Sequence, residues 1–206
     1  MNDASIVAAR PQGPATELVL LFHGVGASAA NLLPLAEWIA AARPGAFVVS
    51  VDAPQPSGLG GGREWFSVLG VTEDNRMPRI DAAMPLFRQA VAHWQRESGA
   101  GAERTTLIGF SQGSIMSLES TQDGDPLAAR VVALSGRFAQ PPRRAPAAVR
   151  FHFIHGADDP VIAARFSVEA AQALERLGGR ATVDVLPGLA HGIDARAAQL
   201  AAGYLA

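Results

Sequence analysis

The stretch Gly109-Phe110-Ser111-Gln112-Gly113 decides the fold of this chain. Residues 104–108, directly before it, form a short run of β-branched and apolar residues, which is typical of a buried parallel strand. Residues 114–119, directly after it, favour a helix. A strand that turns this sharply into a helix holds the turn residue in a strained conformation with positive φ. The small residues Gly109 and Gly113 are needed so that the strand and helix backbones do not collide.

This turn makes Ser111 a candidate nucleophile. Its hydroxyl projects from the turn, and the neighbouring backbone N–H groups lie at a helix N-terminus, where they favour developing negative charge. A five-residue G-x-S-x-G string also arises by chance, as a glycine-rich turn with an incidental serine. The interpretation therefore depends on the residues at the ends of the other strands.

Apolar runs that alternate with helical stretches predict an α/β fold. A parallel sheet covered by helices on both faces is expected, because the strands are apolar throughout. We expect one domain over residues 1–206, with the face of the first helix carrying Leu32, Leu35, Trp38 and Ile39. The expected strands span 17–22, 46–51, 104–108, 130–134, 149–154 and 182–186, and the expected helices span 31–42, 78–96, 114–119, 161–177 and 195–205.

Composition excludes several classes of function. The formal net charge is −2, which gives no electrostatic reason to expect a nucleic-acid partner. The chain has no cysteine, so disulfides and a thiolate nucleophile are excluded. No apolar run approaches the roughly 20 residues of a membrane span, and no signal peptide is recognisable. We therefore expect a cytoplasmic protein without a membrane span.

One connection, residues 53–77, is unusually long and rich in glycine and proline. Loops of this length inside compact domains are usually lids or binding segments. Trp65 and Phe66 lie within it, and either anchor the loop in the core or form a wall for an apolar substrate group. Together with Leu59, Leu69 and Val71 they suggest a modest apolar groove.

Reacting groups in open parallel sheets gather at the carboxyl ends of the strands. After the first strong strand, the glycines around Val25 allow its N–H to aim at the site, and with the N–H of Gln112 it would form an oxyanion hole. We interpret His23, in the same loop, as a structural residue that braces it.

Two further strand ends supply the partners of Ser111. Asp159 follows the strand at 149–154 and precedes Pro160, where a carboxylate is either a helix N-cap or the acid that orients an imidazole. His191 follows the strand at 182–186 on a glycine-flanked loop that can reach the serine. The order Ser, Asp, His is the one described for α/β-hydrolases.

The histidines do not suggest a metal site. The chain contains no H-x-x-x-H or H-E-x-x-H spacing, so we do not expect a metal site. Acyl transfer through a serine and its histidine base requires no metal or organic cofactor, and we expect none. His152 and His155 lie three residues apart on one strand and should point to opposite faces. We interpret both as structural and place His93 on a solvated helix surface.

The sequence resembles the phospholipase/carboxylesterase family of serine α/β-hydrolases, the group that includes the acyl-protein thioesterases. The resemblance covers nearly the whole chain and is carried by Leu21-Phe22-His23-Gly24-Val25-Gly26, Asp52-Ala53-Pro54, Arg63-Glu64-Trp65-Phe66, Gly109-Phe110-Ser111-Gln112-Gly113, Ala133-Leu134-Ser135-Gly136, His155-Gly156-x-x-Asp159-Pro160 and Gly188-x-x-His191. It implies a Ser111–His191–Asp159 triad and oxyanion donors at Val25 and Gln112.

The resemblance also implies a lid-like loop near Trp65 and Phe66, within residues 53–77, beside the acyl pocket. The substrate-binding residues that we assign are Gly24, Trp65, Phe66 and Leu69. Family members commonly carry Asp where this chain has Ala157. In its short length the chain resembles the shorter bacterial branch of this family.

The expected activity is a carboxylesterase that cleaves short to medium acyl esters through an acyl-enzyme. Two alternatives stay open at this point. One is a thioesterase or lysophospholipase that acts on acyl-protein, acyl-CoA or lysophospholipid. The other is a non-catalytic binding protein that retains the fold. A homodimer is expected by family analogy alone.

Overall fold

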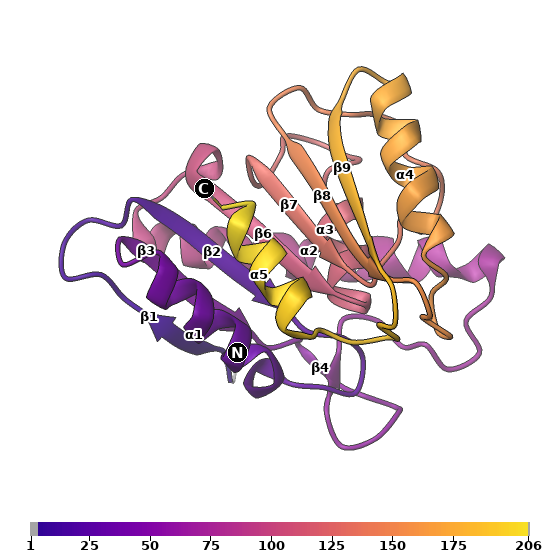
Figure 1. Ribbon diagram of the computed structural model, residues 1–206. Coiled ribbons are helices and arrows are strands. Elements are labelled where there is room, and N and C mark those ends of the chain that lie inside the picture. Colours follow the sequence, from indigo (N-terminus) through magenta and orange to yellow (C-terminus); the bar gives the residue numbers. More distant parts are fainter. Residues whose placement is uncertain (1–3, 206) are drawn as a thin grey trace.

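The computed structural model describes residues 4–205 and is built around one seven-stranded sheet (Figure 1). The strand order is β1-β3-β2-β6-β7-β8-β9, and every neighbouring pair is parallel except β1 with β3. The α/β fold expected from the sequence is confirmed. The strands of the main sheet are Ile6–Ala9 (β1), Glu17–Phe22 (β2), Ala46–Val51 (β3), Thr105–Phe110 (β6), Arg130–Leu134 (β7), Arg150–Gly156 (β8) and Arg180–Leu186 (β9).

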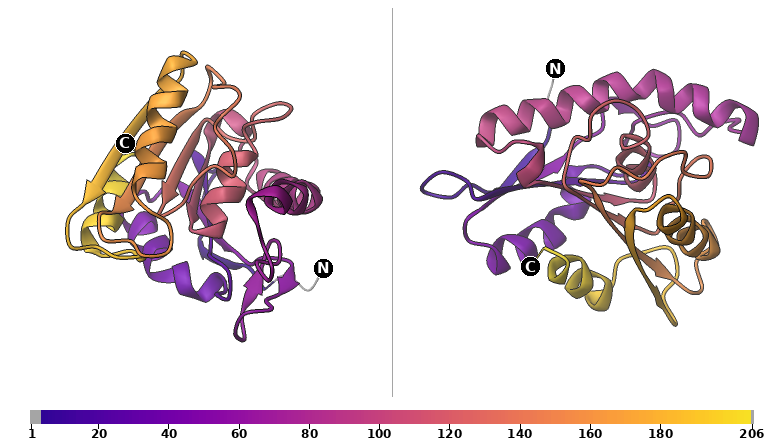
Figure 2. Two further views of the ribbon diagram at one scale, coloured as in Figure 1. Left: turned by 90° about the vertical axis from the view of Figure 1, so that its right-hand side faces the viewer. Right: turned by 90° about the horizontal axis from the view of Figure 1, so that it is seen from above.

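Helices cover both faces of this sheet (Figure 2). Alternate residues of the central strands divide the core between the two faces, because side chains of a strand point alternately to either side. Leu20, Phe22 and Leu107 pack toward the long helix, whereas Val19, Leu21 and Ile108 pack toward the first and last helices. The helices are Leu33–Ala42 (α1), Glu73–Ser98 (α2), Gln112–Glu119 (α3), Arg165–Arg176 (α4) and Ala195–Gly203 (α5), with short 3₁₀ turns at Ala29–Leu32 and Ala102–Arg104.

The expected strands are all present, with small shifts at their ends. The short strand β1 was not expected, because its four residues are only partly buried and pair with β3 at the sheet edge. In α1, Leu35 and Ile39 are buried as expected, but Trp38 is 47% exposed. The prediction for Trp38 was wrong because the short α1 buries a narrow stripe of small and aliphatic residues, and Trp38 lies outside it.

The long α2 begins five residues before the proline expected to start it. Thr72 caps its N-terminus in a reciprocal pair with Asn75, and acidic residues fill the first turn. These N-terminal signals determine the start of the helix, and the prolines at 78 and 85 are accommodated inside it. The segment at 53–77 is therefore shorter as a loop than expected. It also contains a two-stranded hairpin, Gln55–Pro56 (β4) with Arg63–Glu64 (β5).

No helix within residues 4–205 combines the length and apolar character required to cross a bilayer.

Candidate active site

The turn between β6 and α3 holds Ser111 in the conformation expected from its sequence. Ser111 has φ 53° and ψ −113°, and it is the residue that precedes the first turn of α3. A side chain on Gly113 would collide with the carbonyl oxygen of Phe22, and one on Gly109 would collide with the backbone N of Ser114. Glycine is therefore required on both sides of the serine, because strand and helix backbones touch there.

Ser111, His191 and Asp159 form one chain of hydrogen bonds. The Nε2 atom of His191 lies 3.0 Å from the Ser111 hydroxyl oxygen, and its Nδ1 atom lies 2.7 Å from Oδ2 of Asp159. The serine is 8% exposed, the imidazole side chain is 18% exposed and the carboxylate is fully buried. Three strand ends that are far apart in sequence thus meet at one edge of the sheet, in the geometry that allows the imidazole to take the serine proton.

Asp159 is held by its own loop and does not cap a helix. Its Oδ1 atom accepts hydrogen bonds from the backbone N–H groups of Val161 and Ile162, at 2.8 and 2.9 Å. Helix α4 begins only at Arg165, so the expected helix start near residue 161 was wrong. Burial alone would raise the pKa of Asp159, but hydrogen bonds from His191 and from these two N–H groups outweigh it and lower the pKa. The group is therefore a carboxylate near neutral pH.

The loop that carries His191 is fixed to the loop of Asp159. Asp158 accepts a hydrogen bond from the N–H of Gly188 at 2.9 Å, and its own N–H donates to the carbonyl of Leu189 at 3.0 Å. The Phe110 ring packs beside the imidazole, with 5.0 Å between ring centroids. Ala157, where family members commonly carry Asp, is exposed and holds β9 through its backbone alone. The carboxylate that fastens the His191 loop is Asp158, which sequence reasoning did not assign.

Two backbone N–H groups beside Ser111 are free to bind an anion. Val25 and Gln112 both line the cavity at the serine, and within residues 4–205 neither N–H has a hydrogen-bond acceptor. Gly24 lies against the serine, since a side chain there would come within 3.1 Å of the Ser111 Cβ atom. The arrangement has the character of an oxyanion hole, with one donor from the loop after β2 and one from the start of α3.

His23 braces this loop from below. Its Nδ1 donates to the carbonyl of Gly24 at 2.7 Å, and its Nε2 accepts from the N–H of Ala53 at 3.0 Å. The ring is buried, and this burial lowers its pKa although Asp52 lies 3.3 Å from Nε2. A neutral ring that bonds two backbone groups fits the structural role inferred from the sequence.

His155 and His152 also point to opposite faces of β8. His155 is buried beside the candidate acid, with its Nε2 2.7 Å from the carbonyl of Ile162 and 3.2 Å from Oδ2 of Asp159. Burial lowers its pKa, so it is a neutral donor to these oxygens. His152 stacks on Tyr204, with 3.9 Å between ring centroids. Within residues 4–205, no group of three or more His, Cys, Asp or Glu side chains could hold a metal ion.

A cavity of about 340 Å³ opens over Ser111. Phe66 lines it, as expected, whereas Trp65 and Leu69 do not. Trp65 is 1% exposed and packs its ring on Phe22 and Phe87, so the wall expected from it is a core contact. Leu69 is 53% exposed and lies outside the lining. The other lining residues are Val25, Leu59, Val68, Val71, Arg76, Gln112, Ile115, Arg137, Val161, Ile162 and Phe166.

The side chain of Gln112 connects the serine turn to the hairpin segment. Its Oε1 accepts from the N–H of Trp65 at 2.8 Å, and its Nε2 donates to the carbonyl of Phe66 at 2.7 Å. These two bonds place the backbone of the 53–77 segment against the cavity. Sequence reasoning used only the backbone of Gln112, since no local signal shows that two residues 46 and 47 positions away complete its hydrogen bonds.

Comparison with known proteins identifies the family of this chain. The family model of phospholipase/carboxylesterase matches residues 1–206. Esterase YpfH of Escherichia coli (strain K12) is 47% identical over 205 residues, which cover 100% of this chain and 88% of that protein. The esterase PE8 structure has a TM-score of 0.87 at 25% identity, covering 98% of this chain and 96% of that one. A Bacillus cereus carboxylesterase shares the fold, with a TM-score of 0.80 at 17% identity over 99% and 93% of the two chains. The chain therefore belongs to the phospholipase/carboxylesterase family and is an esterase with the α/β-hydrolase fold.

Proposed function

We propose that this esterase is a serine carboxylesterase that cleaves short to medium acyl esters through an acyl-enzyme on Ser111. The observation that carries the proposal is the row of hydrogen bonds from Ser111 through His191 to Asp159, at 3.0 and 2.7 Å, directly below a cavity. A serine alcohol is a weak nucleophile until an adjacent base takes its proton, and this row supplies the base and its orienting carboxylate.

In the acylation step, Ser111 attacks the ester carbonyl carbon while its proton moves to Nε2 of His191. The carbonyl π electrons move to the oxygen, and the N–H groups of Val25 and Gln112 stabilise the resulting oxyanion. Each such donor contributes about 2.7–4 kcal/mol to the transition state. Asp159 stabilises the imidazolium through Nδ1. When the tetrahedral intermediate collapses, the bond to the leaving alcohol breaks and His191 gives the alcohol its proton.

In the deacylation step, water replaces the alcohol. His191 takes a proton from the water as its oxygen attacks the acyl carbonyl, and the same two N–H groups stabilise the second oxyanion. The bond to the Ser111 oxygen then breaks, and His191 returns the proton to it. The proton taken from serine leaves with the alcohol, and the proton taken from water restores the Ser111 hydroxyl. The products of the full cycle are an alcohol, a carboxylic acid and the free enzyme.

The cavity supports the preference for short to medium acyl groups. Its volume of about 340 Å³ lies at the lower end of the range for small-molecule sites. Its lining is mostly apolar and includes Leu59 and Val161, which are 47% and 67% exposed, while Arg76 and Arg137 are its charged residues. Phe66, held by the side chain of Gln112, provides an aromatic surface for the acyl chain. We propose that the 53–77 segment acts as a lid-like border of this acyl site.

The proposal is tested by a panel of chromogenic esters from two to twelve acyl carbons and the matched thioesters. We expect kcat/KM to be highest for the shorter esters and to be lost in Ser111→Ala. Ser135→Ala is the matched control, because Ser135 is also a serine with positive φ at a strand end, φ 46°, but has no hydrogen bond to an imidazole within residues 4–205. A preference for thioesters over esters of equal chain length would favour the thioesterase alternative.

A non-catalytic role is separated by covalent labelling. A fluorophosphonate probe should modify the wild-type protein and not Ser111→Ala. A folded wild-type protein that the probe does not modify would support the binding-protein alternative. The cytoplasmic location and the homodimer stay predictions, and size-exclusion chromatography with light scattering tests the latter.

A further inference from the structure

Three arginines lie side by side where the strands of the sheet begin. We call this the amino edge of the sheet; Ser111 lies at the opposite, carboxyl edge, where the strands end. Arg130, Arg150 and Arg180 are each the first residue of their strand, and they are paired in register across β7, β8 and β9. Neighbouring strands lie about 4.8 Å apart, so the three residues span roughly 10 Å at the backbone. Like charges directly opposite each other destabilise a sheet, so this row requires an explanation.

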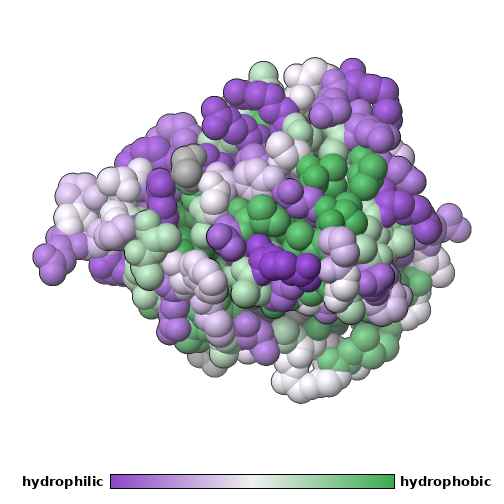
Figure 3. Space-filling view, viewed as in Figure 1, coloured by the Kyte–Doolittle hydropathy of each residue, from purple (hydrophilic) through white to green (hydrophobic). Residues whose placement is uncertain are grey.

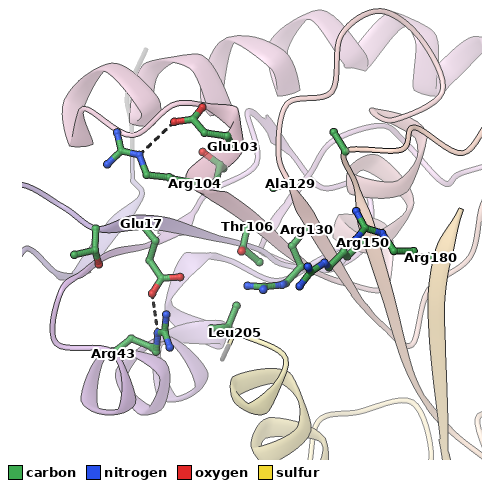
Figure 4. Close-up of a pocket in the computed structure, with 13 residues that line it drawn as sticks. Glu17, Arg43, Glu103, Arg104, Thr106, Ala129, Arg130, Arg150, Arg180 and Leu205 are labelled. Atoms are coloured by element: carbon green, nitrogen blue, oxygen red, sulfur yellow. Dashed lines mark hydrogen bonds and ion pairs between the residues drawn. The ribbon is translucent and has the colours of Figure 1, made fainter.

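The three side chains share one face of the sheet and border a cavity. Arg130 lies on the same face of the sheet as Val132, and Arg150 lies on the same face as Ile154. Both of these apolar residues pack toward α1 and α5. Helix α5 ends at Gly203, and Leu205 lies at the edge of the cavity. Figure 4 shows the side chains of Arg130 and Arg150 pointing into this space. Its volume is about 470 Å³, larger than that of the cavity over Ser111.

None of the three arginines has an acidic partner among the described residues. No carboxylate oxygen of residues 4–205 lies within 4.0 Å of their nitrogens, and Arg180 bonds only the carbonyl of Ala147. The Nε of Arg130 is buried without a hydrogen-bond partner. A buried donor without an acceptor is destabilising, above all in a charged group, so an anion that accepted this hydrogen bond would bind favourably.

The remaining charges around the cavity neutralise each other. Arg43 pairs with Glu17 at 2.7 Å, and Arg104 pairs with Glu103 at 3.2 Å. Glu17 is the carboxylate that faces Arg130, and its charge is met by Arg43. The lining therefore carries three arginines in excess, in a chain whose formal net charge is −2. The positive charge is a local concentration and not a property of the whole surface.

Neighbouring groups respond to this positive charge. His152 occupies the same face two residues beyond Arg150. Burial, followed by the charges of Arg130 and Arg150, lowers its pKa to about 4. Burial and the charge of Arg150 also lower the pKa of Arg130. A bound anion would relieve this repulsion.

We propose that this cavity is a second binding site, which takes a small molecule carrying two or more phosphate groups. Guanidinium groups bind phosphate oxygens in pairs, and a row of three reaches farther than a single phosphate extends. The site is separated from Ser111 by the length of the strands, so it binds a ligand distinct from the ester substrate. The ligand is either an inorganic polyphosphate or the diphosphate of a nucleotide, because both present the same anionic chemistry.

Calorimetric titration with inorganic pyrophosphate, at constant ionic strength near 0.15 M, tests the site. We expect one molecule bound per chain, at least tenfold tighter than orthophosphate. Arg150→Gln and Arg180→Gln should each weaken binding about ten- to hundredfold, because each removes charge-assisted hydrogen bonds. Arg96→Gln is the matched control, since Arg96 is exposed on α2 and lines no part of the cavity. ADP that binds tighter than pyrophosphate identifies a nucleotide source, and equal affinities identify inorganic polyphosphate.

Two further readouts separate binding from a structural role. Without ligand, Arg150→Gln should melt at the wild-type temperature or above it, because it removes a like-charge contact. Its ester hydrolysis should stay at the wild-type rate, whatever the outcome for the proposed carboxylesterase activity. The proposal is overturned if pyrophosphate does not bind, if Arg96→Gln weakens binding as much as Arg150→Gln, or if the protein binds only vesicles of anionic lipid.

Discussion

The carboxyl and amino edges of the sheet differ in whether their charged side chains are paired. At the carboxyl edge, the buried carboxylate of Asp159 has a partner for each oxygen: two backbone N–H groups on one and His191 on the other. At the amino edge, three arginines in register have no carboxylate partner within the described chain. Figure 3 shows hydrophilic surface along the upper side of the molecule and a hydrophobic patch at its lower right.

The difference shows what each edge requires. A proton-transfer site needs its charges balanced before substrate arrives, because a buried unpaired charge would prevent the imidazole from cycling. A binding site for a charged ligand needs the reverse, since the ligand itself supplies the missing charge. The same strands therefore end in a preorganised site and begin in a site that is complete only with its ligand bound.

Among the changes predicted for the two edges, removal of the nucleophile should cause the largest loss of activity. Ser111→Ala should lower kcat for a short ester about 10⁵–10⁶-fold, because no other group in the cavity can form the acyl bond. Steady-state hydrolysis of a chromogenic acetate measures this loss. Pyrophosphate binding should be unchanged in the same variant. A loss of binding together with activity would contradict the separation of the two edges.

Removal of the orienting acid should cost somewhat less. Asp159→Asn should lower kcat about 10⁴-fold, because an amide cannot stabilise the imidazolium and favours the wrong tautomer. Asp158→Asn is the matched comparison. The carboxylate of Asp158 accepts a hydrogen bond from Gly188 in the His191 loop but does not contact the imidazole. We expect a loss of about tenfold or less there. Equal losses in the two variants would contradict the assignment of Asp159.

The selectivity for acyl length should change when the cavity over Ser111 is enlarged. Arg137 lies over the Phe166 ring at 4.4 Å, and both residues also line a neighbouring cavity of about 550 Å³. Arg137→Ala should join the two cavities and raise kcat/KM for longer esters relative to short ones about three- to tenfold, since each buried methylene contributes about 0.8 kcal/mol. Arg165→Ala is the control, because Arg165 stacks on the same ring outside the cavity lining. An unchanged chain-length profile in Arg137→Ala would place the selectivity elsewhere.

The smallest expected effect is a pH dependence of stability at the arginine edge. The pKa of His152 is about 4 in the folded protein and about 6.5 when unfolded, so the unfolded chain binds more protons between these values. The free energy of unfolding should therefore fall as the pH drops from about 6.5 to 4. His152→Phe keeps an aromatic ring against Tyr204 but removes the titrating group. The fall in the free energy of unfolding between pH 6.5 and 4 should therefore be smaller in the variant, by about 1–2 kcal/mol after a discount for partial exposure.

Urea unfolding at several pH values measures this contribution as a difference in slope. The pKa values of His23 and His155 are also lowered by burial, so some of the pH dependence should remain in the variant. A slope identical to wild type would show that His152 does not feel the arginine row.

The sequence predicted the strands and the Ser111 turn well, because both depend on local signals. A buried parallel strand is a largely apolar run, and the observed bounds of β2, β3 and β7 equal the expected ones. The glycines at 109 and 113 indicate that the strand and the helix are in close contact. The strand order then brings His191 and Asp159 to Ser111, since carboxyl ends of parallel strands share one edge.

Features that depend on contacts distant in sequence could not be predicted. Trp65 lies in a glycine-rich loop, and only the tertiary packing on Phe22 and Phe87 shows that it belongs to the core. The bonds from Gln112 to the 53–77 segment and the register of the three arginines depend on which strands become neighbours. No composition or periodicity carries that information.

The position of a covalent adduct decides whether Ser111 is the nucleophile. The wild-type protein is treated with a fluorophosphonate, digested and mapped by mass spectrometry, with Ser135→Ala treated in parallel. A single added phosphonyl mass on the peptide that contains Ser111, in both proteins, is the expected result. Modification of any other serine, or a folded protein that remains unmodified, would contradict the assignment of the carboxyl edge as the site of acyl transfer.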